Sequence, residues 1–495
     1  MKKLNIFLYI TLLSMVLLGC KEFLDQKPYS SLTPENAFTS SDDWQKTLTA
    51  CFGPLQNLYG MDAAILPVFQ VGTDEVTSGI PWDALERLMR YDNLTPDHGD
   101  LTSYYFLCYN GIKGCNSVIH MPNGYVEAGT KDLMVAQAKF LRGVYYFELV
   151  RAWGGVPLWI EGSVDKDQIM KPRSTQDQVY TQVVKDMQEA ENVLPETWTA
   201  NDKGRPTKYA AQAMLARIYL QWGKPADALT YCNKVYGKFH LYENLKDITN
   251  PDRKNEEFEN IFEIQFQHSA TWDIEGGKIN CLWGPFTDLR ISNGGGWGGF
   301  GPSLYMVNQY DRVNDRRWNA WFVTSWAGLP IIGRDYYKNN ELVGAGTIKW
   351  QDLKHNMENN NDNMNHVYIR YADVLLMKAE ALNATNDAGR EKYTCINQVR
   401  ARAGVYQLPD NISIPTEQFV DTLLNERLKE LCFERLRRWD LVRTGRFYDY
   451  MINHTWGKLA DLRKNETVKD KYLLFPIPKS AMDANDAMKE NNPGY

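Results

Sequence analysis

Histidine and cysteine, the side chains that most often hold transition metals, are scarce in this chain of 495 residues. The seven histidines are spread along it without the spacing of metal ligands, and no C-x-x-C pair occurs. The chain also lacks a G-x-x-x-x-G-K-[ST] loop, an H-E-x-x-H or G-x-S-x-G motif and an EF-hand loop. The sequence therefore predicts no metal site, no cofactor and no catalytic residue.

No sign of charge dominates, because 55 Lys and Arg face 61 Asp and Glu, a net charge of −6. The basic residues are scattered and form no stripe, so nucleic acid is disfavoured as a partner. Aromatic residues are abundant instead, with 15 Trp and 28 Tyr. So many rings predict that some are exposed, and exposed rings tend to form binding surfaces.

The apolar run near the N-terminus, Ile6–Leu18, is too short to span a bilayer comfortably. It follows two lysines and ends in "LLGC", which looks like a bacterial lipobox. We therefore expect residues 1–19 to be a signal peptide and Cys20 to be the acylated residue, with its acyl chains anchoring the protein to a membrane. The alternative is an ordinary cleaved signal that happens to precede a cysteine.

Seven cysteines remain after Cys20, and most are expected to be small buried apolar residues. A disulfide between Cys108 and Cys115 is an open alternative if the exported chain reaches an oxidising compartment.

Helical periodicity dominates after a lipidated tether at residues 20–41. Three pairs of segments have the pattern of helices that pack against each other, and the second has the small-residue spacing of a tetratricopeptide repeat. These pairs are 134–153 with 177–195, 205–221 with 225–237, and 372–384 with 391–404. A last helix is predicted over 416–446. Its arginines lie at helical spacing beside glutamates, which favours ion pairs over a ligand site.

Residues 246–351 break the helical pattern, because they are rich in Gly, Asn, Asp and Trp. This composition predicts short strands and long loops. The fold class is therefore mainly α: tetratricopeptide-like helical pairs form the scaffold, and a large irregular region contains short strands. The chain would divide into an N-terminal helical part, 42–245, and a C-terminal part, 246–495, within one compact unit. The asparagine-rich stretch from His355 to His366 is expected to be a solvated loop.

The stretch "ISNGGGWGGFGPS", residues 291–303, contains a match to G-x-G-x-x-G. No βαβ unit surrounds it, so it does not predict a nucleotide site. Its glycines would instead let the backbone turn and present Trp297 or Phe300 to a ligand, unless both rings pack inward.

Tryptophan rings near polar side chains suit a sugar, because the ring stacks on the apolar face of a pyranose and the polar groups bind its hydroxyls. On this chemistry alone, the candidate ligand-binding residues are Trp272, Trp283, Arg290 and Trp297. The neighbours Asp74 and Glu75 could be imagined as a glycosidase pair, but one pair of sequence neighbours is weak support and a turn or cap is the simpler interpretation.

Several motifs taken together resemble one family. "AKFLRGVYYFELVRAWGGVPL", "RPTKYAAQAMLARIYL", "IRYADVLLMKAEAL", "NERLKELCFERLRRWDLVRTGR" and "LLFPIPKSAMDANDAMKENNPGY" occur in this order, with others between them. Over essentially its whole length the chain resembles the SusD/RagB family of nutrient-binding outer-membrane lipoproteins of Bacteroidetes.

The resemblance implies a non-enzymatic, lipid-anchored protein of the outer membrane that faces the cell exterior. It would capture an oligosaccharide and deliver it to a partner SusC-like TonB-dependent transporter. Cys20 matches the acylated cysteine, Trp82 matches the position of a sugar-stacking aromatic after "GTDE", and Asp74 matches the acidic position of that motif. Peptide binding on the same architecture and a glycoside hydrolase are the alternatives. The identity of the glycan, its affinity and any bound calcium stay open.

Overall fold

The structure is a computed structural model. It describes residues 40–61, 72–78, 91, 94–162, 169–199, 202–267, 283, 299–326, 328–331, 333–335, 341–351, 363–386, 389–409, 411–454 and 471–495. Across these ranges, no helix combines the length and the apolar character that a bilayer crossing requires. Cys20 lies outside them, so its acylation stays a prediction.

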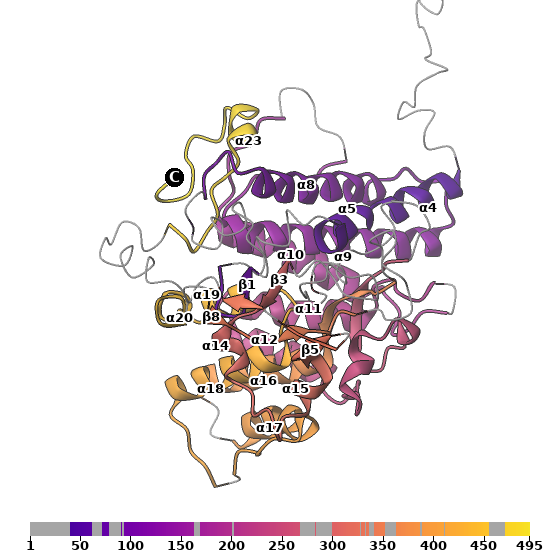
Figure 1. Ribbon diagram of the computed structural model, residues 1–495. Coiled ribbons are helices and arrows are strands. Elements are labelled where there is room, and N and C mark those ends of the chain that lie inside the picture. Colours follow the sequence, from indigo (N-terminus) through magenta and orange to yellow (C-terminus); the bar gives the residue numbers. More distant parts are fainter. Residues whose placement is uncertain are drawn as a thin grey trace, which may run out of the picture.

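Two long helices, α8 and α9, lie side by side at one end of the molecule (Figure 1). The helices of the N-terminal part are α4 (Ser41–Ala50), α5 (Gly53–Gln56), the π-helix η1 (Asn57–Met61), α8 (Gly99–Ile119), α9 (Ala128–Trp153), α10 (Gln176–Glu191), α11 (Lys208–Gln221) and α12 (Pro225–Val235). Helix α9 packs between α8 and α10, and α11 packs on α12. The two helix pairs predicted in this part are confirmed.

The ends of α9 and α10 follow from local sequence signals. The Glu127 carboxylate caps α9 by accepting the Thr130 N–H at 3.1 Å. The helix ends at Gly154, whose φ of 71° stops the helical path. Thr175 and Gln178 form a reciprocal capping box at the start of α10.

Glycines let α9 approach its two neighbours closely. A Cβ on Gly111 of α8 would lie 2.3 Å from the Tyr145 ring of α9, and a Cβ on Gly143 of α9 would lie 2.9 Å from Met187 of α10. Because real Cβ atoms do not approach other atoms so closely, a larger residue at Gly111 would force the helices apart.

The C-terminal part adds α14 (Leu304–Val307), α15 (Arg316–Trp321), α16 (Tyr371–Ala384), α17 (Glu391–Ala403), α18 (Thr416–Glu430), α19 (Arg437–Arg443), α20 (Phe447–His454), α23 (Lys479–Asp483) and the 3-10 helices η4 (Leu245–Thr249) and η5 (Pro251–Arg253). Helix α16 packs on α12, α17 and α18, which joins the C-terminal helices to the N-terminal ones. The predicted pairing of α16 with α17 is confirmed.

The strands of the described residues form five separate antiparallel pairs. They are β1 (Val76–Ser78) with β3 (Phe300–Pro302), β2 (Asn260–Ile264) with β10 (His366–Arg370), β4 (Phe322–Val323) with β9 (Gly346–Thr347), β5 (Ser325–Trp326) with β6 (Leu329–Pro330), and β7 (Arg334–Asp335) with β8 (Glu341–Leu342). Most are only two or three residues long, so the prediction of a mainly α fold with short strands in a loop-rich region is confirmed.

The single helix predicted over 416–446 is wrong. The chain forms α18 and α19 with a buried turn between them, in which Phe433 and Arg435 adopt left-handed backbone angles with φ of 62° and 63°. Non-glycine residues seldom adopt this conformation. A tertiary hydrogen bond helps to hold it in place. Arg370 Nη2 donates to the Glu430 carbonyl at 2.7 Å, so this carbonyl at the end of α18 has a partner although the helix does not continue.

The described cysteines support one expectation and overturn another. Six are free and buried: Cys51, Cys108, Cys115, Cys232, Cys395 and Cys432. They are small buried residues, as expected. The disulfide between Cys108 and Cys115 is absent, because both side chains pack as free thiols on the buried face of α8.

Candidate functional site

A buried network of charges forms the frame of the C-terminal part. The Arg370 guanidinium, on β10, bonds Glu430 at 2.7 Å and Glu434 at 2.8 Å, and it also bonds Glu259. All four side chains are buried. Burial by itself would raise the pKa of the Glu430 carboxyl, but Arg402, Arg370 and Arg317 lower it below its ordinary range. The Glu430 carboxylate is therefore ionised and neutralised by arginine.

Lys349 extends this network toward the surface. Its ammonium donates to the Glu434 carboxylate at 2.6 Å and to the Cys432 carbonyl at 2.9 Å, inside the turn between α18 and α19. The same ammonium lies 4.1 Å from the centre of the Trp321 ring. Lys349 and Trp321, both buried, also line an open groove.

The groove has a volume of about 220 Å³ and is formed by three separate segments. Its lining residues are Lys246, Thr249, Asn250, Pro251, Ala320, Trp321, Trp326, Ile348, Lys349 and Gln351. The first four come from η4 and η5, the next three from α15 and β5, and the last three from the residues after β9. This volume is below the ~300–1,000 Å³ of most ligand pockets, so the groove would hold a single ring or a short unit of a longer ligand.

Trp326 gives the groove an apolar face. The residue is half-buried, yet its indole Nε1 is fully buried and has no hydrogen-bond partner among the residues that the structure describes. The exposed part of its side chain is therefore carbon. It lies on β5, which pairs with β6 in a tight hairpin through Gly328 (φ 81°). A carbon face held on a hairpin is what stacking on a sugar ring requires.

Polar groups come from the lining segment formed by η4 and η5. The Asn250 side-chain oxygen accepts the Asp252 N–H at 3.0 Å, which fixes the amide and leaves its nitrogen without a partner among the described residues. The Thr249 hydroxyl donates to the Lys349 carbonyl at 2.6 Å and keeps its lone pairs for an incoming donor. Lys246 is exposed at the rim. Together with Trp326 these groups combine an apolar platform with polar contacts.

The structure places two of the predicted ligand residues in the interior. Trp283 is 2 % exposed and packs against Phe433 with ring centres 4.6 Å apart. Asp74 is fully buried, and both of its oxygens accept from Arg437, at 2.7 and 2.6 Å. Neither side chain can reach a ligand from this position. Phe300, the second ring of the glycine stretch, also packs inward, 5.5 Å from the Trp283 ring.

The other predicted ligand residues, Trp82, Trp272, Arg290 and Trp297, lie outside the described residues. Their roles stay predictions. Sequence reasoning did not single out Trp326, although it belongs to the Trp-rich stretch that was noted. Its neighbours in the groove come from parts of the chain about 75 and 25 residues away, and their meeting is a tertiary event that no local pattern announces.

The two carboxylates considered as a glycosidase pair are not available to a substrate. Glu75 is 1 % exposed; its Oε1 accepts the Phe433 N–H at 2.7 Å, and its Oε2 has no partner in the described part of the chain. Burial raises the pKa of Glu75 to about 8, so this carboxyl is largely protonated at neutral pH. Asp74 and Glu75 instead attach the segment before β1 to the turn between α18 and α19.

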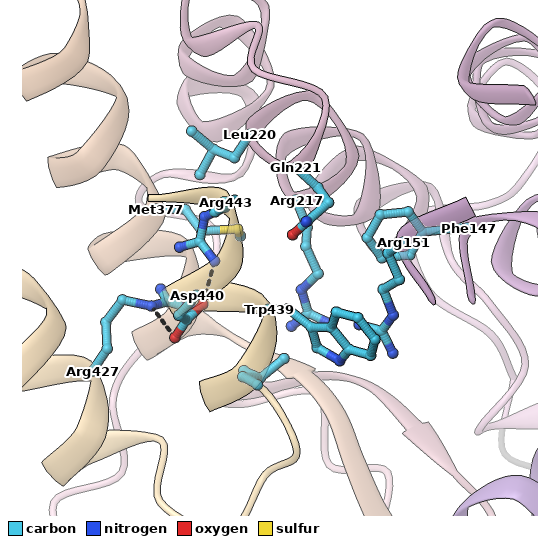
Figure 2. Close-up of a pocket in the computed structure, with 11 residues that line it drawn as sticks. Phe147, Arg151, Arg217, Leu220, Gln221, Met377, Arg427, Trp439, Asp440 and Arg443 are labelled. Atoms are coloured by element: carbon cyan, nitrogen blue, oxygen red, sulfur yellow. Dashed lines mark hydrogen bonds and ion pairs between the residues drawn. The ribbon is translucent and has the colours of Figure 1, made fainter. Parts of the chain in front are cut away.

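The ion pairs predicted for the arginines of residues 416–446 are confirmed for Arg437, Arg443 and Arg446, whereas Arg435 and Arg438 donate to backbone carbonyls. Figure 2 shows Arg427 and Arg443 bonded to Asp440 beside a small cavity among α9, α11, α16, α18 and α19. Arg151 lies over the Trp439 ring at 4.6 Å in the same place. The cavity has a volume of about 10 Å³, room for one water molecule, so it offers no ligand site.

The prediction of a solvated loop is wrong at His366. It begins β10, is 1 % exposed and stacks on the Trp350 ring with centres 5.5 Å apart. Burial and then the nearby Arg435 hold the pKa of His366 well below its usual range, so the ring is neutral. The rest of the asparagine-rich stretch, up to residue 362, lies outside the described residues. In the part that is described, no group of three or more His, Cys, Asp or Glu is placed to hold a metal.

Comparisons with known proteins show to which family this architecture belongs. A family model described as "SusD family" matches residues 332–495, and a second, described as "Starch-binding associating with outer membrane", matches residues 22–220. The chain belongs to the SusD/RagB family.

Relatives of this family match along most of their length. A SusD-like protein of Formosa agariphila is 24% identical over all of both chains, and one of Bacteroides ovatus is 26% identical over 94% of this chain and 87% of the relative. Among solved structures, a laminarin-binding SusD-like protein has a TM-score of 0.76 at 23% identity, covering 92% of this chain and all of that one. Surface glycan-binding protein A from Bacteroides thetaiotaomicron, in complex with laminarihexaose, has a TM-score of 0.73 at 22% identity, with the same coverage. At these identities the solved structures show only that the fold is shared.

Proposed function

We propose that this SusD/RagB protein is a non-catalytic, cell-surface lipoprotein that captures oligosaccharides and delivers them to a SusC-like TonB-dependent transporter in the outer membrane. The groove carries the proposal. It combines the carbon surface of Trp326 with an amide and an ammonium donor that have no partner among the described residues, and this combination suits a sugar ring. Two proteins of the same fold, one laminarin-binding and one solved in complex with laminarihexaose, support a glycan as the ligand class.

The lack of catalysis is part of the proposal. The carboxylates that sequence reasoning weighed for hydrolysis are buried, and one of them is committed to an arginine. A glycosidase needs two accessible carboxyl groups on either side of the scissile bond. Asp74 and Glu75 do not meet this requirement.

Glycan binding is tested with purified residues 21–495 and a panel of oligosaccharides and peptides in titration calorimetry. Trp326→Ala removes the platform, and we expect at least a tenfold loss of affinity for any glycan that binds, or ~1.4 kcal/mol and more. Tyr406→Ala is the matched control, because Tyr406 is 72% exposed on the connection from α17 to α18, outside the groove. Binding of peptides alone, or release of glycan fragments during incubation, would overturn the proposal.

Anchoring and delivery are tested in cells with the full chain. We expect wild-type protein in the outer-membrane fraction, together with a co-purifying transporter, and Cys20→Ala protein in the soluble fraction. A Cys20→Ala chain that stays in the membrane fraction would contradict the lipid anchor. Wild-type protein that co-purifies with no transporter would contradict delivery to one.

A further inference from the structure

The lining of the groove carries charge of one sign. Two lysines, Lys246 and Lys349, line it, and no aspartate or glutamate does. The absence of acidic residues refers only to the lining residues that the structure describes. It matters because a neutral sugar presents hydroxyls that both donate and accept, and carboxylates often accept from them, whereas an anionic group presents acceptors only.

Only one of the two lysines is available to a ligand. The Lys349 ammonium is 2.6 Å from the Glu434 carboxylate and is buried, so its charge is already neutralised. Lys246 is exposed, and it forms no ion pair with any described residue. Its neighbour Asp247 does not neutralise it, because that carboxylate is engaged by Arg253.

Asn250, another polar residue of the described lining, also offers a donor. The Asn250 amide oxygen is occupied by the Asp252 N–H, so only its nitrogen is left. Lys246 and Asn250 both belong to the stretch formed by η4 and η5, and therefore lie on one side of the groove. An ammonium and an amide N–H₂ on one lining segment, with no carboxylate among the described lining residues, form a donor set that suits an oxyanion.

We infer that the groove selects an anionic sugar, a uronic acid or a sulfated residue of a polysaccharide, and holds its oxyanion with Lys246 and Asn250 while the ring stacks on Trp326. This inference rests on the proposed glycan-binding function and specifies its substrate class. A carboxylate and a sulfate ester share the chemistry that the donors recognise. A charge-assisted hydrogen bond at an exposed rim makes a modest contribution, so removing Lys246 should weaken binding about five- to tenfold.

The test compares matched ligands and matched variants of residues 21–495. The ligands are an oligogalacturonate and its fully methyl-esterified form, and a sulfated galactan oligosaccharide and its desulfated form. The variants are Lys246→Gln, Lys246→Arg and the control Lys238→Gln, an exposed lysine outside the groove. Dissociation constants are measured at 50 and 300 mM salt.

We expect at least one charged ligand to bind more tightly than its neutral counterpart, with a preference that shrinks at high salt. Lys246→Gln should remove this preference, and Lys246→Arg and Lys238→Gln should retain it. Preference for the uronate identifies a carboxylate, and preference for the sulfated oligosaccharide identifies a sulfate ester. Equal binding of charged and neutral forms that still depends on Trp326 would overturn this inference and leave the proposed function standing. If no glycan binds in a way that depends on Trp326, both this inference and the proposed function are overturned.

Discussion

Replacement of Glu75 by glutamine should change how the stability of the protein depends on pH. Glu75 is buried against the turn between α18 and α19, where its Oε1 accepts the Phe433 N–H at 2.7 Å. Burial raises its pKa from 4.5 to about 8 in the folded chain. In the unfolded chain the carboxyl has its ordinary pKa, so between these two values the folded state holds a proton that the unfolded state has lost.

The sign of the effect follows from this difference. Stability from the protonated Glu75 is fully present below about pH 4.5 and is lost as the pH rises toward 8. Each pH unit in this window lowers the free energy of unfolding by up to ~1.4 kcal/mol. Glutamine has the shape of the protonated acid, keeps an oxygen for the Phe433 N–H and does not titrate. The variant should therefore gain on the wild type by ~3 kcal/mol between pH 4.5 and pH 7.

The measurement is the difference in unfolding free energy between the two proteins, obtained by pulse proteolysis in urea at pH 5, 6, 7 and 8. Taking the difference cancels the titration of groups that both proteins share, such as Asp440, whose pKa burial would raise but Arg427 and Arg443 lower. Glu243→Gln, at an exposed site, is the control and should follow the wild type at every pH. A difference that stays constant from pH 5 to pH 8 would refute a protonated Glu75.

Two further substitutions test the packing. Arg370→Met leaves Glu259, Glu430 and Glu434 without their shared partner, and urea unfolding should show a loss of ~3–5 kcal/mol. Exposed Arg316→Met is its control, and equal stability of the two variants would contradict a network held by Arg370. Gly111→Ala should lower the melting temperature by several degrees, because its Cβ would lie 2.3 Å from the Tyr145 ring, at a cost of ~1–3 kcal/mol. Gly99→Ala in the same helix meets no atom within 4 Å and should be tolerated; an equal loss in both variants would refute the close approach of α8 and α9.

The helical scaffold could be predicted because its signals are local. Small residues at repeat spacing, caps such as Thr175 and stops such as Gly154 each act within a few residues of the helix they define. The sequence does not predict helix α8, because Gly111 and the polar and aromatic residues around it have low helix propensity. The close packing of α8 against α9 nevertheless requires a glycine at position 111.

The break after α18 and the groove could not be predicted, because tertiary contacts decide both. Nothing in "ELCFERLRR" announces a turn, and the left-handed residue Phe433 is held by Glu75, which is more than 350 residues away in the sequence. Asp74 is a similar case: its motif was recognised, but its partner Arg437 decides that it faces inward. The groove joins residues near 250, 325 and 350, and only the folded chain shows that Trp326 and Asn250 line the same groove.

The position of Lys349 bears on how the ligand preference of such a protein can change during evolution. Its ammonium belongs to the buried charges and the residue also lines the groove, so one residue separates an inner frame from an outer rim. Substitutions at Lys246, Asn250 or Trp326 alter what the rim recognises without disturbing an ion pair of the frame. A library randomised at those three positions leaves the buried ion pairs intact and should yield folded proteins with new ligand preferences, with a cost of about 1 kcal/mol where the Asn250 cap of η5 is lost.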